Sequence, residues 1–600
     1  MSERIGEITE DFALRQAGVD WNLTLDPPYY EQIKENERLF AGDAWHGVQA
    51  AGLPKPNFGV GKRIINHFVS SIMSQRITSV VRGINVSKDG DSATEILARE
   101  VTKFANDAIP VVWERQKVDS LLRQALFDSA IAGDACAYCW LDMTKNTRNK
   151  METDGEIAVE LIDATNVHFG NPNDSRVQTQ PYIIISYRDT VGNLKRKAKA
   201  SGASKSIIDQ ICGDSDTDYQ AGERFDNEVS GSDDNAKATA VIKLWKEDVD
   251  GELHVFKRES TRGVVFIEKT DTNLRLYPVS WMCWDKRKGS FHGQSPITGL
   301  APNWRFINKL FAMMGMSLMN TAFPRLVYDK TRISAPTNAV GQMYGVNGEV
   351  NGAMTYLNGA QQSGNVMSSI EAAIKYTKDM LGASDAFMGD IRPENKSAII
   401  AVTKNASIPL ESVKANLYQF VEDMVLVWLD MMRAYYGVRD VVRHELGMEV
   451  KKPFDFSSLG SYDLAVHVDV GASSYWSEIG TLQTLDTLLQ QKLISPELYI
   501  ELIPDTVLSG KQRIVDHLKA SNKTQQVLNV ALMQFVQGLP PEQQQAIRNM
   551  PEDQMQNAAM EMFLQAQQGG QRMIPAPMGG AAEAATRPEN MSGMSDGMMQ

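Results

Sequence analysis

A pattern of apolar positions at the three- and four-residue spacing of an α-helix occupies residues 302–323. The first apolar stripe consists of Trp304, Ile307, Phe311, Met314 and Leu318. The second consists of Phe306, Leu310 and Met313. After Arg305 and Lys309, almost no face of this helix is left for water, so the pattern predicts cover on several sides. Pro302 is expected to open the helix and Pro324 to end it, because proline fits a first turn and not an interior.

Three environments would cover such a helix: the core of its own subunit, a membrane, or copies of itself in a ring. The stretch free of charge, 310–323, is shorter than the roughly 20 residues that a bilayer requires. The sequence therefore predicts no membrane span. From this stretch alone, two interpretations remain open: a helix in the core of its own subunit, and a helix covered by neighbouring copies of the chain.

Short runs rich in β-branched and aromatic residues predict strands earlier in the chain, with Asp250 and Gly251 placed as a hairpin turn. The predicted strands are 135–142, 156–162, 181–188, 241–247, 252–257 and 264–268. Helices are expected at 92–108 and 112–131, and residues 163–173 are expected to form a loop. This order of elements predicts an α+β domain with an antiparallel meander.

After the apolar helix the chain changes character several times. Residues 334–364 are dense in Gly and Asn, with strands expected at 325–328 and 354–357. Helices are predicted at 365–383 and from Pro409 to Gly437, with a polar loop between them and a returning strand at 464–470. Further helices are expected to about residue 567, followed by a tail from 568 without periodicity, which predicts disorder.

Composition narrows the classes of function that the chain can have. The net charge is -13, with 61 basic and 74 acidic residues, so there is no global basic field to clamp nucleic acid. Any contact with DNA is expected to be local or weak. Four cysteines in 600 residues exclude a disulfide scaffold, and the polar N-terminus predicts assembly in a reducing cytosol.

The sequence predicts no catalytic residue, metal or cofactor. Cys136 and Cys139 form a C-x-x-C within a predicted strand, and no second pair completes a zinc site. Gly59, Gly61 and Lys62 suggest a phosphate loop only superficially, because the first glycine and the Ser or Thr of that motif are missing. A nucleotide-dependent enzyme is kept as a weaker alternative.

The order of elements resembles the portal proteins of tailed bacteriophages. The resemblance rests on this organisation and on stretches such as FHGQSPITGLAPNWRFINKL, KDMLGASDAFMGD and GASSYWSEIGTLQTLDTLLQQKLISPELYIEL. It covers the chain from about residue 58 to about residue 567, and no catalytic motif supports it. A head-to-tail adaptor or minor capsid protein is the main alternative, and such proteins lack this succession of segments.

The resemblance implies a portal-like α+β subunit divided into eight segments. They are an N-terminal wing (1–285), a first stem helix (286–323), a small β/loop clip (324–364), a second stem helix (365–383), a tunnel loop (384–408), a long helix and return strand completing the wing (409–470), a helical crown (471–567) and a disordered tail (568–600). The implied assembly is a dodecameric ring at one capsid vertex, built in the host bacterial cytoplasm. Double-stranded DNA enters through the ring during packaging and leaves through it at infection.

The implied partners are further copies of the chain, double-stranded DNA, the terminase large subunit, a head-to-tail adaptor, and the major capsid or scaffold protein. The stripe from Trp304 to Leu318 is expected to mediate stem-to-stem packing. The candidate lumen cations are Lys375, Lys378, Arg392, Lys396 and Lys404. Ordinary solvated side chains are the alternative interpretation of these cations.

Overall fold

The structure is a computed structural model, and it divides into two compact units, Met1–Thr487 and Leu488–Gln600. It describes residues 8–47, 52–74, 77–83, 93–143, 155–214, 234–322, 325–334, 343, 345–357, 365–383, 408–445, 448–470, 484–491, 493–503 and 514. The described part of the second unit contains α13 (Pro496–Leu502), whose first turn is capped by the Ser495 hydroxyl. All other elements below belong to the first unit.

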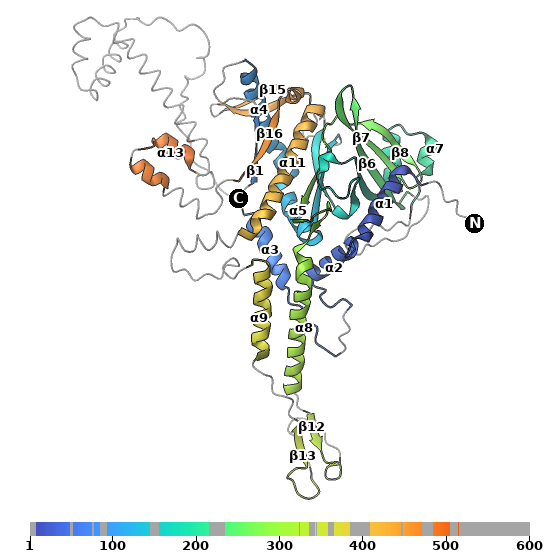
Figure 1. The fold of residues 1–600 in the computed structure, drawn as a ribbon, viewed down its shortest axis with the longest axis vertical. Helices are drawn as coiled ribbons and strands as arrows, with labels where there is room; N and C mark the ends of the chain where they lie inside the picture. Colours follow the sequence, from blue (N-terminus) through green and yellow to red (C-terminus); the bar gives the residue numbers. More distant parts are fainter. Residues whose placement is uncertain are drawn as a thin grey trace, which may run out of the picture. The chain divides into compact units, whose positions relative to one another are not determined.

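Helices and strands alternate along the first unit (Figure 1). The helices are α1 (Glu10–Thr24), α2 (Tyr29–Ala41), α3 (Val60–Ile72), α4 (Ala93–Gln116), α5 (Val118–Ala132), α6 (Val191–Ala200), α7 (Lys205–Gln210), α8 (Pro296–Ala322), α9 (Asn365–Met380) and α11 (Glu411–Tyr435). The strands are β1 (Ile77–Gly83), β2 (Asp134–Asp142), β3 (Glu156–Ile162), β4 (Val167–Phe169), β5 (Tyr182–Thr190), β6 (Lys237–Val249), β7 (Glu252–Thr261), β8 (Val265–Asp271), β9 (Val279–Cys283), β10 (Asp285–Lys286), β11 (Gly293–Gln294), β12 (Arg325–Tyr328), β13 (Met354–Leu357), β14 (Val438–Glu445), β15 (Met448–Asp455) and β16 (Leu464–Val470). The predicted α+β class is confirmed.

The predicted antiparallel meander is a five-stranded sheet in the order β4-β5-β6-β7-β8. Its central hairpin turns at Asp250 and Gly251, whose φ angles of 55° and 89° are those of the left-handed region. That conformation suits the tight turn between paired right-twisted strands, so the predicted hairpin is confirmed. The predicted loop at 163–173 is partly wrong, because residues 167–169 form β4 and pair with β5.

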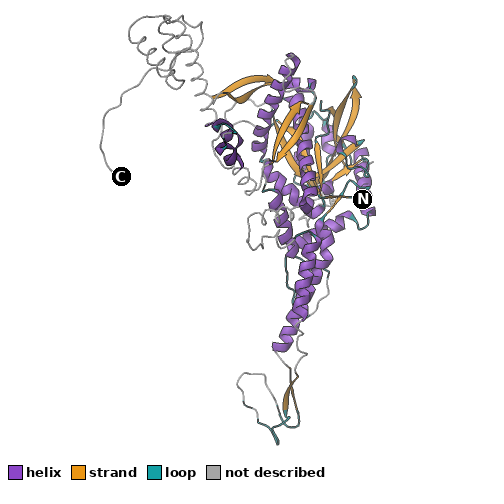
Figure 2. Cartoon of the chain, turned by 60° about the vertical axis from the view of Figure 1, so that its left-hand side comes forward, coloured by secondary structure: helices purple, strands orange, loops and turns teal. Residues whose placement is uncertain are grey.

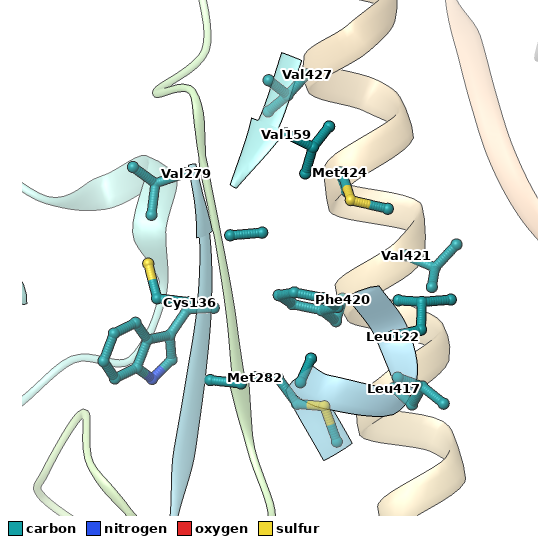
Figure 3. Close-up of a cluster of buried hydrophobic side chains, with 14 of the residues drawn as sticks. Leu122, Cys136, Val159, Val279, Met282, Leu417, Phe420, Val421, Met424 and Val427 are labelled. Atoms are coloured by element: carbon teal, nitrogen blue, oxygen red, sulfur yellow. The ribbon is translucent and has the colours of Figure 1, made fainter. Parts of the chain in front are cut away.

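A second sheet, in the order β3-β2-β9, packs against the long helix α11 (Figure 3). Phe420 of α11 is 1% exposed and lies among side chains from both the helix and the sheet. Asp430, one helical turn beyond this contact region, accepts the backbone N–H groups of Arg275 and Leu276 at 2.7 and 2.9 Å. The carboxylate thereby ties α11 to the segment that enters β9.

Two prolines lie inside helices where the sequence predicted boundaries. Pro302 was predicted to open a helix, and Pro110 falls between the stretches 92–108 and 112–131 that were predicted as separate helices. Pro110 is within α4, and Pro302 is within α8, which begins at Pro296. Apolar side chains are buried on both sides of each proline, including Ile109 and Trp304. Their burial outweighs the roughly 3 kcal/mol that an interior proline costs a helix.

Two pairs of strands were not fully anticipated from the sequence. The returning strand β16 was predicted, but its partner β1 was not, and the hairpin of β14 and β15 was missed. β1 pairs with β16 along its whole length, although nearly 400 residues separate them. The further helices predicted to about residue 567 lie largely outside the described residues.

Burial raises the pKa of Asp128 on α5 to about 6, and the charges of Asp163 and Glu37 add to the effect. A carboxyl whose pKa is higher in the folded than in the unfolded state destabilises the fold as pH rises through that interval. Asp128→Asn should therefore raise the free energy of unfolding at pH 7.5, by up to about 3 kcal/mol, since each pKa unit corresponds to about 1.4 kcal/mol. The gain should vanish below about pH 4. Urea unfolding at pH 7.5 and pH 4 measures both values, and a gain independent of pH would contradict the assignment.

Candidate functional site: the paired helices α8 and α9

Helices α8 and α9 lie side by side, and the β12–β13 hairpin lies beyond their far ends (Figures 1 and 2). The first turns of α8 are held by α2. The Thr298 hydroxyl accepts hydrogen bonds from Gln32 Nε2 at 2.6 Å and from Asn36 Nδ2 at 3.0 Å. Two helical turns further, Arg305 forms an ion pair with Glu35. These contacts fix where α8 leaves the body of the unit.

The middle of α8 packs against the segment that leads into α3. Trp304 Nε1 donates to the Phe58 carbonyl at 2.8 Å, and the side-chain Oδ1 of Asn308 accepts the Phe58 N–H at 2.9 Å. Phe311 stacks on the Phe58 ring with centroids 3.9 Å apart. Gly61 of α3 lies under Trp304, where an added Cβ would come within 2.4 Å of the indole. The glycine at this position is therefore required by the close approach of the two helices.

The last turns of α8 are largely uncovered within the described residues. The exposed fractions there are 52% for Met313, 38% for Met316, 49% for Leu318 and 47% for Met319. Met313, Met316 and Met319 follow a spacing of three residues, which places them along one row of the helix. From 310 to 322 the helix carries no charged residue, and its only polar side chains are Ser317, Asn320 and Thr321, so this surface is mainly apolar.

Helix α9 buries Ile370 and Thr377 and leaves apolar side chains exposed as well. Met367, Tyr376 and Met380 are 48%, 73% and 60% exposed. Met380 also touches α8, since Asn303 Nδ2 lies 3.7 Å from its sulfur. The pair of helices therefore presents an apolar surface that its own contacts do not cover, which we call the α8–α9 face; it consists of Phe306, Met313, Met316, Leu318, Met319, Met367, Tyr376 and Met380.

The structure separates the stripe predicted to mediate stem-to-stem packing into two parts. Trp304 and Ile307 are 1% and 0% exposed and pack within the subunit. Phe311 and Met314 are half-buried, and Leu318 is the one member of the stripe that belongs to the α8–α9 face. The second stripe contributes Phe306 and Met313 to the face instead.

The predicted lumen cations fall into two groups. Lys375 is exposed on α9, and Lys378 is half-buried on the same helix. Arg392, Lys396 and Lys404 lie outside the described residues, together with residues 384–407 of the predicted tunnel loop. The described structure therefore brings together only the two lysines of α9.

A buried polar cluster at the entry to α8 was missed by sequence reasoning. The Asp134 carboxylate accepts from Tyr29 Oη at 3.0 Å and from the Gly293 N–H at 2.6 Å, and it lies 2.8 Å from His292 Nδ1. His292 Nε2 lies 3.0 Å from Asn22 Oδ1, which links the cluster to α1. Burial and the Asp134 charge raise the pKa of Tyr29 well above its ordinary value, so Tyr29 remains a donor.

This cluster joins α1, α2, β2 and the segment before α8. The partners of His292 come from distant parts of the sequence, so no local pattern indicates this cluster. Among the described residues, no group of three or more His, Cys, Asp or Glu side chains could hold a metal ion. No described helix is long and apolar enough to cross a membrane.

Residues 284–574 match the model of the phage P22-like portal protein family. This part of the chain is similar to the phage portal family. The predicted resemblance is confirmed, and the match supports a phage portal function. The matched region begins just before α8 and includes the α8–α9 face and α11. A search of curated proteins finds no match for the chain.

The family match indicates the kind of particle in which residues 284–574 act. The family is a structural component of the virion, associated with the capsid as an oligomeric ring. In a ring, further copies of α8 and α9 are available to cover the α8–α9 face, which a single chain leaves exposed. The sequences before residue 284, including both sheets, lie outside the matched region.

Gly61→Ala should destabilise the seating of α8 on α3, because the added Cβ meets the rigid Trp304 ring. The expected loss in the free energy of unfolding is about 1–3 kcal/mol, the usual cost of overpacking. Gly299→Ala is the matched control, since its Cβ would meet only Met380 Cε at 3.8 Å and alanine favours a helix. Equal midpoints of thermal unfolding for the two variants would contradict the packing described.

Proposed function

We propose that the chain assembles into a dodecameric portal ring at one capsid vertex. The observation that carries the proposal is the α8–α9 face, within a region that matches the portal family. An apolar face of this kind in one chain favours burial against other copies of itself. In the proposed subunit, α8 and α9 form the stem, the β12–β13 hairpin the clip, and the two sheets with α11 the wing.

The chemistry of the face suits repeated contacts between helices. Methionine is flexible and polarizable, so a row of methionines packs against surfaces of varied shape. Half-burying one such side chain contributes about 1 kcal/mol. Each subunit would offer this contribution at several positions on both of its edges in a closed ring.

The proposed ring conducts double-stranded DNA during packaging, retains it, and releases it at infection. Such a conduit must not bind DNA tightly, because each phosphate neutralised by a fixed cation adds to a salt-dependent binding free energy. On α9, Lys375 and Lys378 are balanced by Glu371 and Asp379. On α8, Arg305 is paired with Glu35. Lys309 of α8 is exposed. The small number of charges on the two helices supports the proposed conduit.

The proposed partners follow from the same assignment. The terminase large subunit and the head-to-tail adaptor would bind the ring in turn, and the major capsid or scaffold protein would hold it at the vertex. The exposed Val327 and Val350, 44% and 72% exposed in the β12–β13 region, would be available to such partners. Assembly would take place in the host bacterial cytoplasm before the ring enters the virion.

The double variant Met313→Glu, Met316→Glu should abolish ring formation, because it introduces charges into the α8–α9 face. Negative-stain electron microscopy and mass photometry would then report single subunits in place of annular particles. Met143→Glu is the matched control, since Met143 is 64% exposed, directly follows β2 and is on neither helix. Rings of unchanged size in the double variant would contradict the proposed interface.

Lys375→Gln combined with Lys378→Gln tests the lumen assignment. Removing cations that contact passing DNA should lower the slope of log affinity against log salt for double-stranded DNA on assembled rings, since each phosphate contact contributes about 0.9 to that slope. Lys199→Gln on α6 is the control, because Lys199 is exposed in a different part of the unit. A slope equal to that of the unchanged ring would assign both lysines to ordinary solvated positions.

A further inference from the structure

A cavity of about 950 Å³ lies between the three-stranded and five-stranded sheets. One wall comes from β2 and β3, the other from β5, β6 and β7, and α11 closes one side with Met431 and Tyr435. Its volume is within the range of small-molecule and peptide sites, about 300–1,000 Å³. The proposed portal assembly assigns no role to this cavity.

The wall formed by β2 and β3 carries an aromatic platform beside a carboxylate. Tyr138 and Trp140 point to the same side of β2 and stack with ring centroids 5.7 Å apart. Glu160 is paired directly opposite Tyr138 in the β2–β3 register. Side chains opposite each other in antiparallel strands have Cβ atoms about 4.5–5.5 Å apart, so Glu160 adjoins the platform.

The cations that line the cavity are already neutralised. Lys257 Nζ lies 2.7 Å from Glu259, and Lys197 Nζ lies 3.2 Å from Asp189. Arg188 is paired at 3.0 Å with Asp214, which is not part of the lining. Burial alone would lower the pKa of Lys257, but Tyr138 and Glu259 outweigh burial and raise it, so this ion pair persists at neutral pH.

Two acids therefore remain without a cation. Asp163 accepts the Thr165 N–H at 3.1 Å and the Thr165 hydroxyl at 2.9 Å, which satisfies one of its oxygens. Glu160 is exposed at the cavity, and no hydrogen bond or ion pair joins it to another described residue. The cavity thus combines an unpaired carboxylate with the face of a half-buried tryptophan.

We propose that this cavity binds an alkylguanidinium group, the side chain of an arginine presented by an extended segment of a partner protein. The planar cation stacks on Trp140 while its N–H groups donate to the Glu160 carboxylate, the arrangement that arginine forms best among cationic side chains. The apolar floor of Ile242, Leu244 and Leu274 accommodates side chains that flank the arginine. The remaining volume exceeds one guanidinium, which favours a peptide over a single small cation.

Saturation-transfer difference NMR on the assembled full-length protein tests this site with N-acetyl-arginine methylamide as the probe. The method suits a large particle because signals are read from the small probe. Saturable transfer to the side-chain protons next to the guanidinium is expected, with affinity on the order of millimolar for so small a ligand. The neutral isostere N-acetyl-citrulline methylamide should bind at least about tenfold more weakly, since it lacks the charge.

Glu160→Gln should weaken arginine binding about tenfold, because it removes one charge-assisted contact worth about 1.4 kcal/mol. Glu268→Gln is the matched control, since Glu268 is an exposed strand glutamate outside the cavity. Trp140→Leu should cause a comparable loss, and circular dichroism checks that the variant folds. Three results would overturn the proposal: no saturable binding, equal binding of the citrulline probe, or equal affinity in the Glu160→Gln and Glu268→Gln proteins.

Discussion

Helix α8 carries more apolar surface than its own subunit covers, and the proposed architecture depends on that imbalance. Its first half is seated on α2 and α3 through Trp304, Asn308 and Phe311, with hydrogen bonds to the backbone of Phe58. Its second half has no charged residue and leaves methionines about half exposed. The same helix is therefore a core element at one end and an assembly element at the other.

The polar cluster around Asp134 complements this imbalance. A buried carboxylate with hydrogen-bonding partners from α2 and from the segment before α8 specifies one arrangement of these elements, because each alternative would leave a buried polar group unpaired. The apolar surface supplies the drive to associate, whereas the polar cluster sets the direction in which α8 leaves the body. A ring of defined geometry requires both.

Charge is distributed differently in the two regions that we assign to binding. Along α8 and α9 it is sparse, which suits a surface that must let a polyanion pass. Between the two sheets it is paired except at Glu160 and Asp163, beside the rings of Tyr138 and Trp140. The first arrangement suits transit and the second suits retention of a specific cation.

Periodicity alone determined most strands of the meander, the hairpin at Asp250 and Gly251, and the existence of α8, α9 and α11, because these signals are local. Tertiary structure decided that α4 continues through Pro110 and α8 through Pro302. The burial of Ile109 and Trp304 outweighs the free-energy cost of a proline inside a helix. Tertiary structure also decided which residues of the α8 stripe stay exposed, the pairing of β1 with β16, and the meeting of Asp134 with His292. Those outcomes depend on partners far away in the chain, and a pattern read within one stretch carries no information about which distant surface will cover it.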